Sequence, residues 1–146
     1  MKKYTFRNMI AAASLVFGFS GVGSAHADIF GGFLGAPAGA TDVYGVTCPI
    51  GTTSVQANVN DGVGVGVEVS VQVINPNGRA VTASAPDSGG PSGLVALAGG
   101  AGNYLVTVHK DAAPNEGYSV FMDCYIGAVA IAGNKAVQVQ NKEAPS

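Results

Sequence analysis

The sequence predicts an all-β fold: a single antiparallel β-sandwich, immunoglobulin-like or jelly-roll-like, with one disulfide. Three observations lead to this prediction. Apolar and polar residues alternate with period two, most clearly from Val65 to Val73, where every odd position is valine. Turn clusters of Gly, Asn, Asp and Pro recur about every ten residues. Residues 28–146 hold both cysteines and show no sustained helical period.

The first 27 residues have the features of an export signal. Lys2, Lys3 and Arg7 precede a short apolar stretch, and an A-x-A pattern ends at Ala27. The apolar stretch is about half of the roughly 20 residues that a membrane span requires, and no later segment is long and apolar enough. We expect cleavage after Ala27, which leaves 146 − 27 = 119 residues, and an exported protein, periplasmic or extracellular, without a membrane span.

The next segment, residues 28–41 (DIFGGFLGAPAGAT), is apolar and glycine-rich and lacks clear periodicity. We predict a flexible lead here. The alternative is an extended strand that completes a sheet edge, in its own molecule or in a neighbour's. The sandwich domain is then expected over residues 42–141, with a polar tail at 142–146.

The strands of the sandwich are placed by their alternation of apolar and polar side chains. They are expected around residues 44–48, 54–59, 65–73, 81–84, 104–108 and 118–124. Residues 126–140 are expected to form a last hairpin around Gly133-Asn134. Turn formers separate the strands, among them Asn60-Asp61-Gly62, Asn75-Pro76-Asn77-Gly78 and Gly99 to Gly102.

The two cysteines, Cys48 and Cys124, predict a disulfide, because an even cysteine count is typical of exported chains that form such bonds. Each is in phase with the apolar face of its strand, so both should point into the core. The bond would close a loop of about 77 residues and stabilise the fold by about 4 kcal/mol in the chain-entropy model. Two free thiols or an intermolecular bridge are the alternatives.

The charge balance excludes two classes of partner. After cleavage, four basic residues stand against nine carboxylates, a formal charge of 4 − 9 = −5. The four cations are scattered, so the chain offers no basic footprint for nucleic acid and no polybasic patch for an anionic membrane.

Candidate catalytic and metal-binding residues are sparse, so we predict no enzyme, no catalytic residues, no metal and no cofactor. His109 is the one histidine left after cleavage, and its position at a strand end favours an outward-facing side chain. The nine carboxylates are spread singly, without the pair that a glycosidase uses. His109 and Asp111 could face the same way, but two ligands do not make a zinc site.

Phe121 and Tyr125 are the candidate ligand-binding residues. They lie on the strand face opposite to Cys124, with Asp123 between them, and form a candidate exposed aromatic patch. The alternative is that the last hairpin or residues 28–41 cover this face.

The motifs from Asp42 to Tyr125 resemble the bacterial pre-peptidase C-terminal domain. They are the valine strand leading into Asn75-Pro76-Asn77-Gly78, the strand Gly102–Val108, and Tyr118-Ser119-Val120. The resemblance covers roughly 80 residues and implies a secreted β-sandwich module, of a kind usually appended to extracellular enzymes, with surface or polysaccharide binding. It transfers no catalytic residue. The chain departs from the family in lacking a protease domain and in carrying the cysteine pair.

Together these observations predict an exported, non-catalytic structural or interaction module of the bacterial envelope or extracellular matrix, with a protein or polysaccharide partner. One alternative is a carbohydrate-binding module that uses Phe121 and Tyr125. Another is a surface-fibre subunit that self-assembles, as a homo-oligomer, through residues 28–41.

Overall fold

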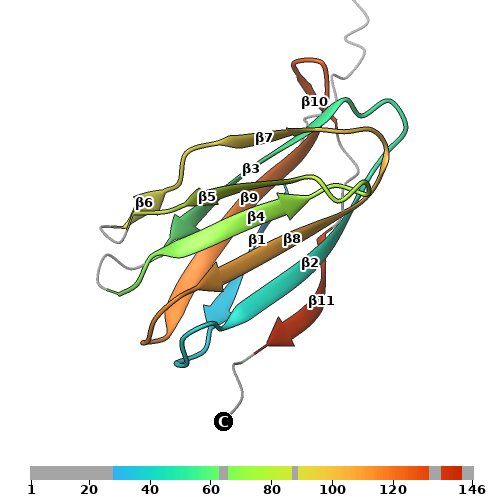
Figure 1. The fold of residues 1–146 in the computed structure, drawn as a ribbon. Helices are drawn as coiled ribbons and strands as arrows, with labels where there is room; N and C mark the ends of the chain where they lie inside the picture. Colours follow the sequence, from blue (N-terminus) through green and yellow to red (C-terminus); the bar gives the residue numbers. More distant parts are fainter. Residues whose placement is uncertain (1–27, 63–65, 87–88, 132–135, 143–146) are drawn as a thin grey trace, which may run out of the picture.

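The computed structural model describes residues 28–62, 66–86, 89–131 and 136–142, and all strand pairs in these ranges are antiparallel. The strands form two sheets packed face to face, which confirms the predicted sandwich (Figure 1). The predicted signal peptide, residues 1–27, lies outside the described residues.

Sheet A has six strands in the order β1-β9-β3-β6, with β10 also paired to β9 and β7 to β3. Their bounds are β1 (Asp28–Leu34), β3 (Ser54–Asp61), β6 (Gly90–Pro91), β7 (Val95–Ala98), β9 (Glu116–Ile126) and β10 (Val129–Ile131). Sheet B has five strands in the order β11-β2-β8-β4-β5. Their bounds are β2 (Thr41–Cys48), β4 (Val69–Ile74), β5 (Ala80–Ser84), β8 (Gly102–Lys110) and β11 (Ala136–Lys142).

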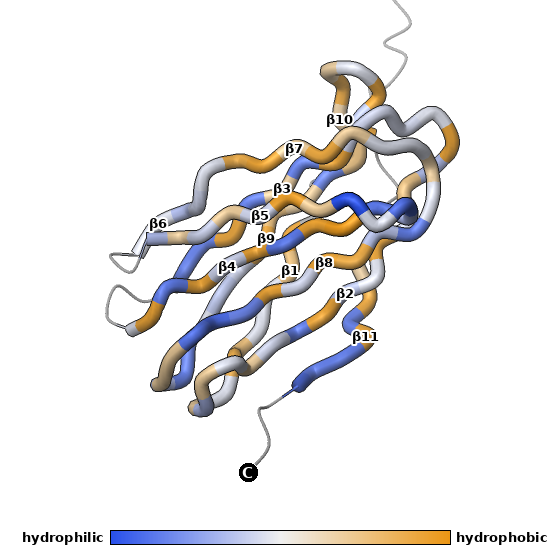
Figure 2. The backbone as a smooth tube through the Cα atoms, viewed as in Figure 1, coloured by the Kyte–Doolittle hydropathy of each residue, from blue (hydrophilic) through white to orange (hydrophobic). Residues whose placement is uncertain are grey.

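The core lies between the sheets and is built from the inward half of each alternating strand. Apolar and polar residues alternate along the backbone in Figure 2, as the period-two pattern predicts. Contacts between the sheets place β7 over β5 and β3 over β4, while β2 lies against both β1 and β9. The fully buried side chains include valines of β3, β4 and β8, together with Tyr104, Val120 and Met122.

The predicted disulfide is present. Cys48 at the end of β2 is bonded to Cys124 in β9, with the two Cα atoms 5.8 Å apart. Both cysteines are buried, as their phase with the apolar faces requires. The bond therefore joins sheet B to sheet A near one end of the sandwich.

The prediction of a flexible lead is wrong for residues 28–34, which form β1 and pair with β9 along their full length. Two side chains explain this. Leu34 is fully buried, and the centroid of the Phe30 ring lies 4.4 Å from the centroid of the Tyr44 ring. Gly31 lets the strands approach closely, since a Cβ atom there would lie 2.5 Å from the carbonyl oxygen of Tyr118. The sandwich thus begins at residue 28 rather than 42, and β1 completes a sheet edge in its own molecule.

Two other elements differ from their predictions. The strand predicted from Val65 begins at Val69 in the structure. Val67 donates its backbone N–H to the Glu116 carboxylate (3.1 Å) instead of to a neighbouring strand. Val65 lies outside the described residues. Gly133-Asn134, the turn of the predicted last hairpin, lies outside the described residues, and the described strands on either side of it do not pair with each other. β10 pairs with β9 in sheet A, whereas β11 pairs with β2 in sheet B, and Ile131 and Ala136 pack against the core from these two sheets.

Candidate functional site

The sequence-predicted candidates lie apart from one another. His109 is half-buried on the outer face of sheet B, in register between Thr41 and Ser70. Asp111 follows it in an exposed turn. Within the described ranges, no group of three or more His, Cys, Asp and Glu side chains is placed to hold a metal ion.

Phe121 and Tyr125 share the outer face of β9 but do not form an exposed platform. Both are half-buried, and buried Asp123 separates them. Burial and, secondarily, the neighbouring Asp123 carboxylate raise the pKa of Tyr125. In the part of the chain that the structure describes, β1 and β10 do not lie across this face, because both lie beside β9 in the same sheet.

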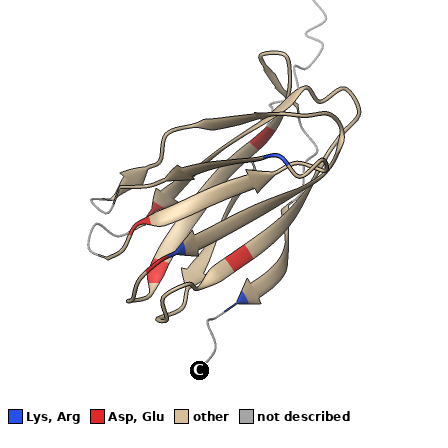
Figure 3. Ribbon diagram, viewed as in Figure 1, with Lys and Arg blue, Asp and Glu red and all other residues tan. Residues whose placement is uncertain are grey.

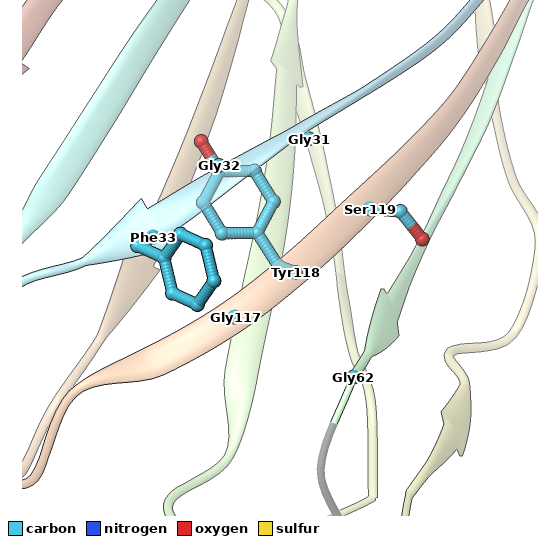
Figure 4. Close-up of a pocket in the computed structure, with 7 residues that line it drawn as sticks. All are labelled: Gly31, Gly32, Phe33, Gly62, Gly117, Tyr118 and Ser119. Atoms are coloured by element: carbon cyan, nitrogen blue, oxygen red, sulfur yellow. The ribbon is translucent and has the colours of Figure 1, made fainter.

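The outer face of sheet A has a groove next to Phe121, of about 670 Å³ (Figure 4). Three glycines supply a floor without side chains: Gly31 in β1, Gly117 in β9, and Gly62 directly after β3. Phe33, which is 75% exposed, stands at its side, and its Cε1 atom lies 3.1 Å from where a Cβ of Gly117 would be. The aromatic ring therefore lies against the backbone of β9.

Two uncharged polar side chains, Ser119 and Asn60, lie at the groove or next to it. Gly31 is in register with Ser119, and Ser119 is in register with Asn60 on β3. Ser119 is half-buried and lines the groove, and exposed Asn60 lies beside Ser119 on β3, so an uncharged hydroxyl and an uncharged amide are available on this side of the groove. Sequence reasoning missed this groove. The signal available was the glycine at each of the three positions, but their register was needed to combine them.

Few charges reach the surface of the sandwich (Figure 3). Five charged side chains are buried: Asp42, Asp61, Lys110, Glu116 and Asp123. The other charged side chains whose exposure is described are Glu68, Arg79, Asp111 and Lys142, all in turns or at a strand end. Over the described residues, the outer faces of the two sheets therefore expose no charged side chain apart from their margins, and the one carboxylate on the outer side of β9, Asp123, is buried.

A chain of hydrogen bonds joins the sheets below the groove. The Tyr118 hydroxyl donates to Oδ2 of Asp42 (2.5 Å), and the hydroxyls of Tyr44 and Tyr118 are 2.6 Å apart. Gly32 leaves room for these groups, since a Cβ there would lie 2.9 Å from the Tyr118 hydroxyl. Burial, followed by the hydrogen bonds to Asp42 and Tyr44, raises the pKa of Tyr118 well above its usual range.

Tyr118→Phe tests this series of hydrogen bonds. At neutral pH we expect the free energy of unfolding to fall by about 2 kcal/mol, because the buried Asp42 carboxylate loses a donor. The wild-type hydroxyl keeps its proton in the folded state above pH 10.0, where an unfolded tyrosine loses it, so folding stability decreases as pH rises beyond this value. The variant should lose stability less steeply, by about 1.4 kcal/mol per pH unit. Urea titrations from pH 9 to 11 measure both slopes, and parallel slopes would contradict the assignment.

Two buried charged side chains close the same end of the sandwich. Lys110 Nζ donates to the carbonyl oxygens of Ala36 (3.4 Å), Ala112 (3.0 Å) and Pro114. Glu116 accepts the N–H of Val67, and its carboxylate fills the space that a Cβ of Gly66 would need. These contacts bind turns to strands, so we assign both side chains to the architecture that supports the groove.

Comparison with the known protein families finds no family model that matches the chain, and comparison with curated proteins likewise finds no match. Among the described residues, there is no helix with the length and apolar character needed to cross a membrane.

Proposed function

We propose that the protein is an exported, non-catalytic structural or interaction module of the bacterial envelope or extracellular matrix, and that its partner binds the groove on sheet A. Export rests on the signal features of residues 1–27 and agrees with the Cys48–Cys124 bond, since disulfides persist in oxidising compartments. The predicted resemblance to a secreted accessory domain agrees with the same setting.

The observation that carries the proposal is the uncharged, glycine-floored groove beside an exposed aromatic ring. A concave, largely apolar surface with a few polar groups is the usual form of a binding site. Phe33 would supply an anchor that loses most of its exposed area on binding, and the glycine floor would let a flat group approach the backbone.

The groove also supports the second candidate, a carbohydrate-binding module, at a different place from Phe121 and Tyr125. Phe33 offers an apolar face for a sugar ring, and Ser119 in the same groove, with Asn60 next to it on β3, offers hydrogen bonds. The absence of charged side chains from the groove lining favours a neutral sugar over an acidic one.

Phe33→Ala tests the proposal with Leu105→Ala as the matched control. Both side chains are exposed apolar groups, but Leu105 lies on the outer face of sheet B. We expect Phe33→Ala to weaken retention of the purified protein on isolated cell-envelope material about tenfold, a loss typical of an aromatic anchor. Leu105→Ala should bind like the wild type.

The same assay on immobilised neutral polysaccharides separates the two candidates. Binding to polysaccharide that Phe33→Ala weakens would assign the groove to sugar, whereas binding only to envelope material from which polysaccharide has been removed would assign it to protein. Equal retention of the wild type and of both variants would overturn the proposal.

A further inference from the structure

The turn between β4 and β5 holds the one Asn-Gly pair in the sequence, Asn77-Gly78. Both residues are exposed, and a Cβ atom on Gly78 would meet nothing within 4 Å apart from its chain neighbours. Glycine leaves its own backbone nitrogen free of steric hindrance, so an asparagine that precedes glycine is the most open to attack by that nitrogen on its side-chain amide. The turn therefore places a reactive pair in contact with water.

Asn75 holds this turn closed. Its side-chain oxygen accepts the backbone N–H groups of Asn77 (3.0 Å) and Arg79 (2.9 Å), and its backbone oxygen accepts the N–H of Gly78 (2.9 Å). Asn75 is buried, and its Nδ2 donates to the carbonyl oxygen of Ala98 at the end of β7 (3.3 Å). The two oxygens of one buried residue therefore hold three consecutive N–H groups of the turn.

We propose that Asn77 is a site of spontaneous deamidation, and that the hydrogen bonds of Asn75 set the rate of this reaction. In the first step, the backbone nitrogen of Gly78 attacks Cγ of Asn77, and a bond between these two atoms closes a five-membered succinimide ring. The bond from Cγ to Nδ2 breaks, and ammonia leaves with the proton of the Gly78 nitrogen. Water then opens the ring at either of its two carbonyl carbons, which gives aspartate or isoaspartate at position 77. Water is the only co-reactant, and no atom changes its oxidation state.

The closed turn opposes the first step. The N–H of Gly78 that must lose its proton is the group that donates to the backbone oxygen of Asn75. The nitrogen must also swing toward the Asn77 side chain, while the N–H of Asn77 is held by the side-chain oxygen of Asn75. The reaction therefore proceeds from the minor population in which the turn is open, and its rate is reduced by the fraction of molecules in that state.

The product changes the turn in two ways. Either form places a carboxylate at an exposed position next to Arg79, so each event adds one negative charge to the protein. Isoaspartate also routes the main chain through the former side chain, which lengthens the main chain by one carbon atom. The N–H groups of Gly78 and Arg79 then no longer match the spacing of the two Asn75 oxygens, so the turn loses hydrogen bonds.

Peptide mapping by mass spectrometry, on the purified, disulfide-bonded protein incubated at mildly alkaline pH, tests the site and its control by Asn75. We expect Asn77 to convert about tenfold more slowly than in a free peptide of residues 74–80, and Asn75→Ala to remove most of that protection. Asn58→Ala, which removes a half-buried asparagine from sheet A, should leave the rate unchanged. Equal rates in the wild type and Asn75→Ala would overturn the role of Asn75. Conversion of exposed Asn103, which precedes a bulky residue, ahead of Asn77 would overturn the site.

Low urea concentrations test the same step in the wild type, without reliance on the folding of Asn75→Ala. Opening of a single turn exposes little surface, so the deamidation rate of Asn77 should stay nearly constant at urea concentrations below the unfolding transition. A rate that rises in proportion to the unfolded population would show that global unfolding exposes the site, and would overturn control by the turn. Neither Asn75 nor Asn77 lines the groove on sheet A, so these results are separate from the ligand-binding test.

Discussion

Replacing both cysteines by alanine, in Cys48→Ala with Cys124→Ala, is expected to lower the free energy of unfolding by about 4 to 5 kcal/mol. The bond joins residues 76 apart in the sequence, and the entropy that a cross-link removes from the unfolded chain increases with loop length. Both sulfur atoms are also buried, so the variant loses packing between the sheets.

Urea unfolding of the oxidised wild type and the double variant measures this loss. Small domains unfold with a total free energy of about 5 to 15 kcal/mol, so the variant should be near the limit of folding at room temperature. The wild type unfolded and refolded under reducing conditions serves as the control: it keeps both sulfur atoms, so it should show the part of the loss that the cross-link contributes, about 4 kcal/mol. A midpoint within experimental error of the wild type would contradict the prediction.

Lys110→Met is expected to lower the free energy of unfolding by about 3 kcal/mol, because carbonyl oxygens of two turns lose a charged donor while the apolar stem is retained. Ala36 belongs to the turn between β1 and β2, and Ala112 to the turn between β8 and β9. Lys142→Met is the matched control. This lysine is exposed at the end of β11, so its replacement should change stability by less than about 0.5 kcal/mol.

Thermal and urea unfolding of both lysine variants give the comparison. Hydrogen exchange of residues 35–40 and 111–115 adds a local measure, since loss of the donor should speed exchange in both turns relative to the rest of the sheet. Equal stability of Lys110→Met and Lys142→Met would show that the buried ammonium contributes nothing net to folding.

The predictable strands are those with one apolar and one polar face. In β4, valine alternates with polar residues from Val69 to Val73. Cys48 and Cys124 are each in phase with the apolar residues of their own strands, and this correctly predicted that both sulfur atoms lie in the core. β1 could not be placed in this way because, after Asp28, both of its faces are apolar or glycine. Phe30 and Leu34 face inward, while Ile29 and Phe33 face outward, so the hydropathy of this edge strand has no period of two.

The groove was beyond prediction for a different reason. Its floor combines glycines from β1 and β9 with one just after β3. In a sequence, a glycine in a groove floor looks the same as a glycine in a turn. Their register depends on strand pairing over long sequence separations. Lys110 did carry a signal, because it is in phase with Tyr104, Val106 and Val108, and such a phase predicts a buried ammonium with backbone partners.

The position of the disulfide has a mechanical consequence for a protein tethered at its two ends. A pulling force would enter through β1 and β2 and leave through the segment after Cys124, passing between them through the covalent sulfur–sulfur bond. The chain between Cys48 and Cys124, which contains β3 to β8 and most of β9, would then carry no tension. Extension under load would be limited to the chain before Cys48 and after Cys124, and the glycine-floored groove would lose Phe33 and β1 while its half beside β3 and on β9 stayed folded.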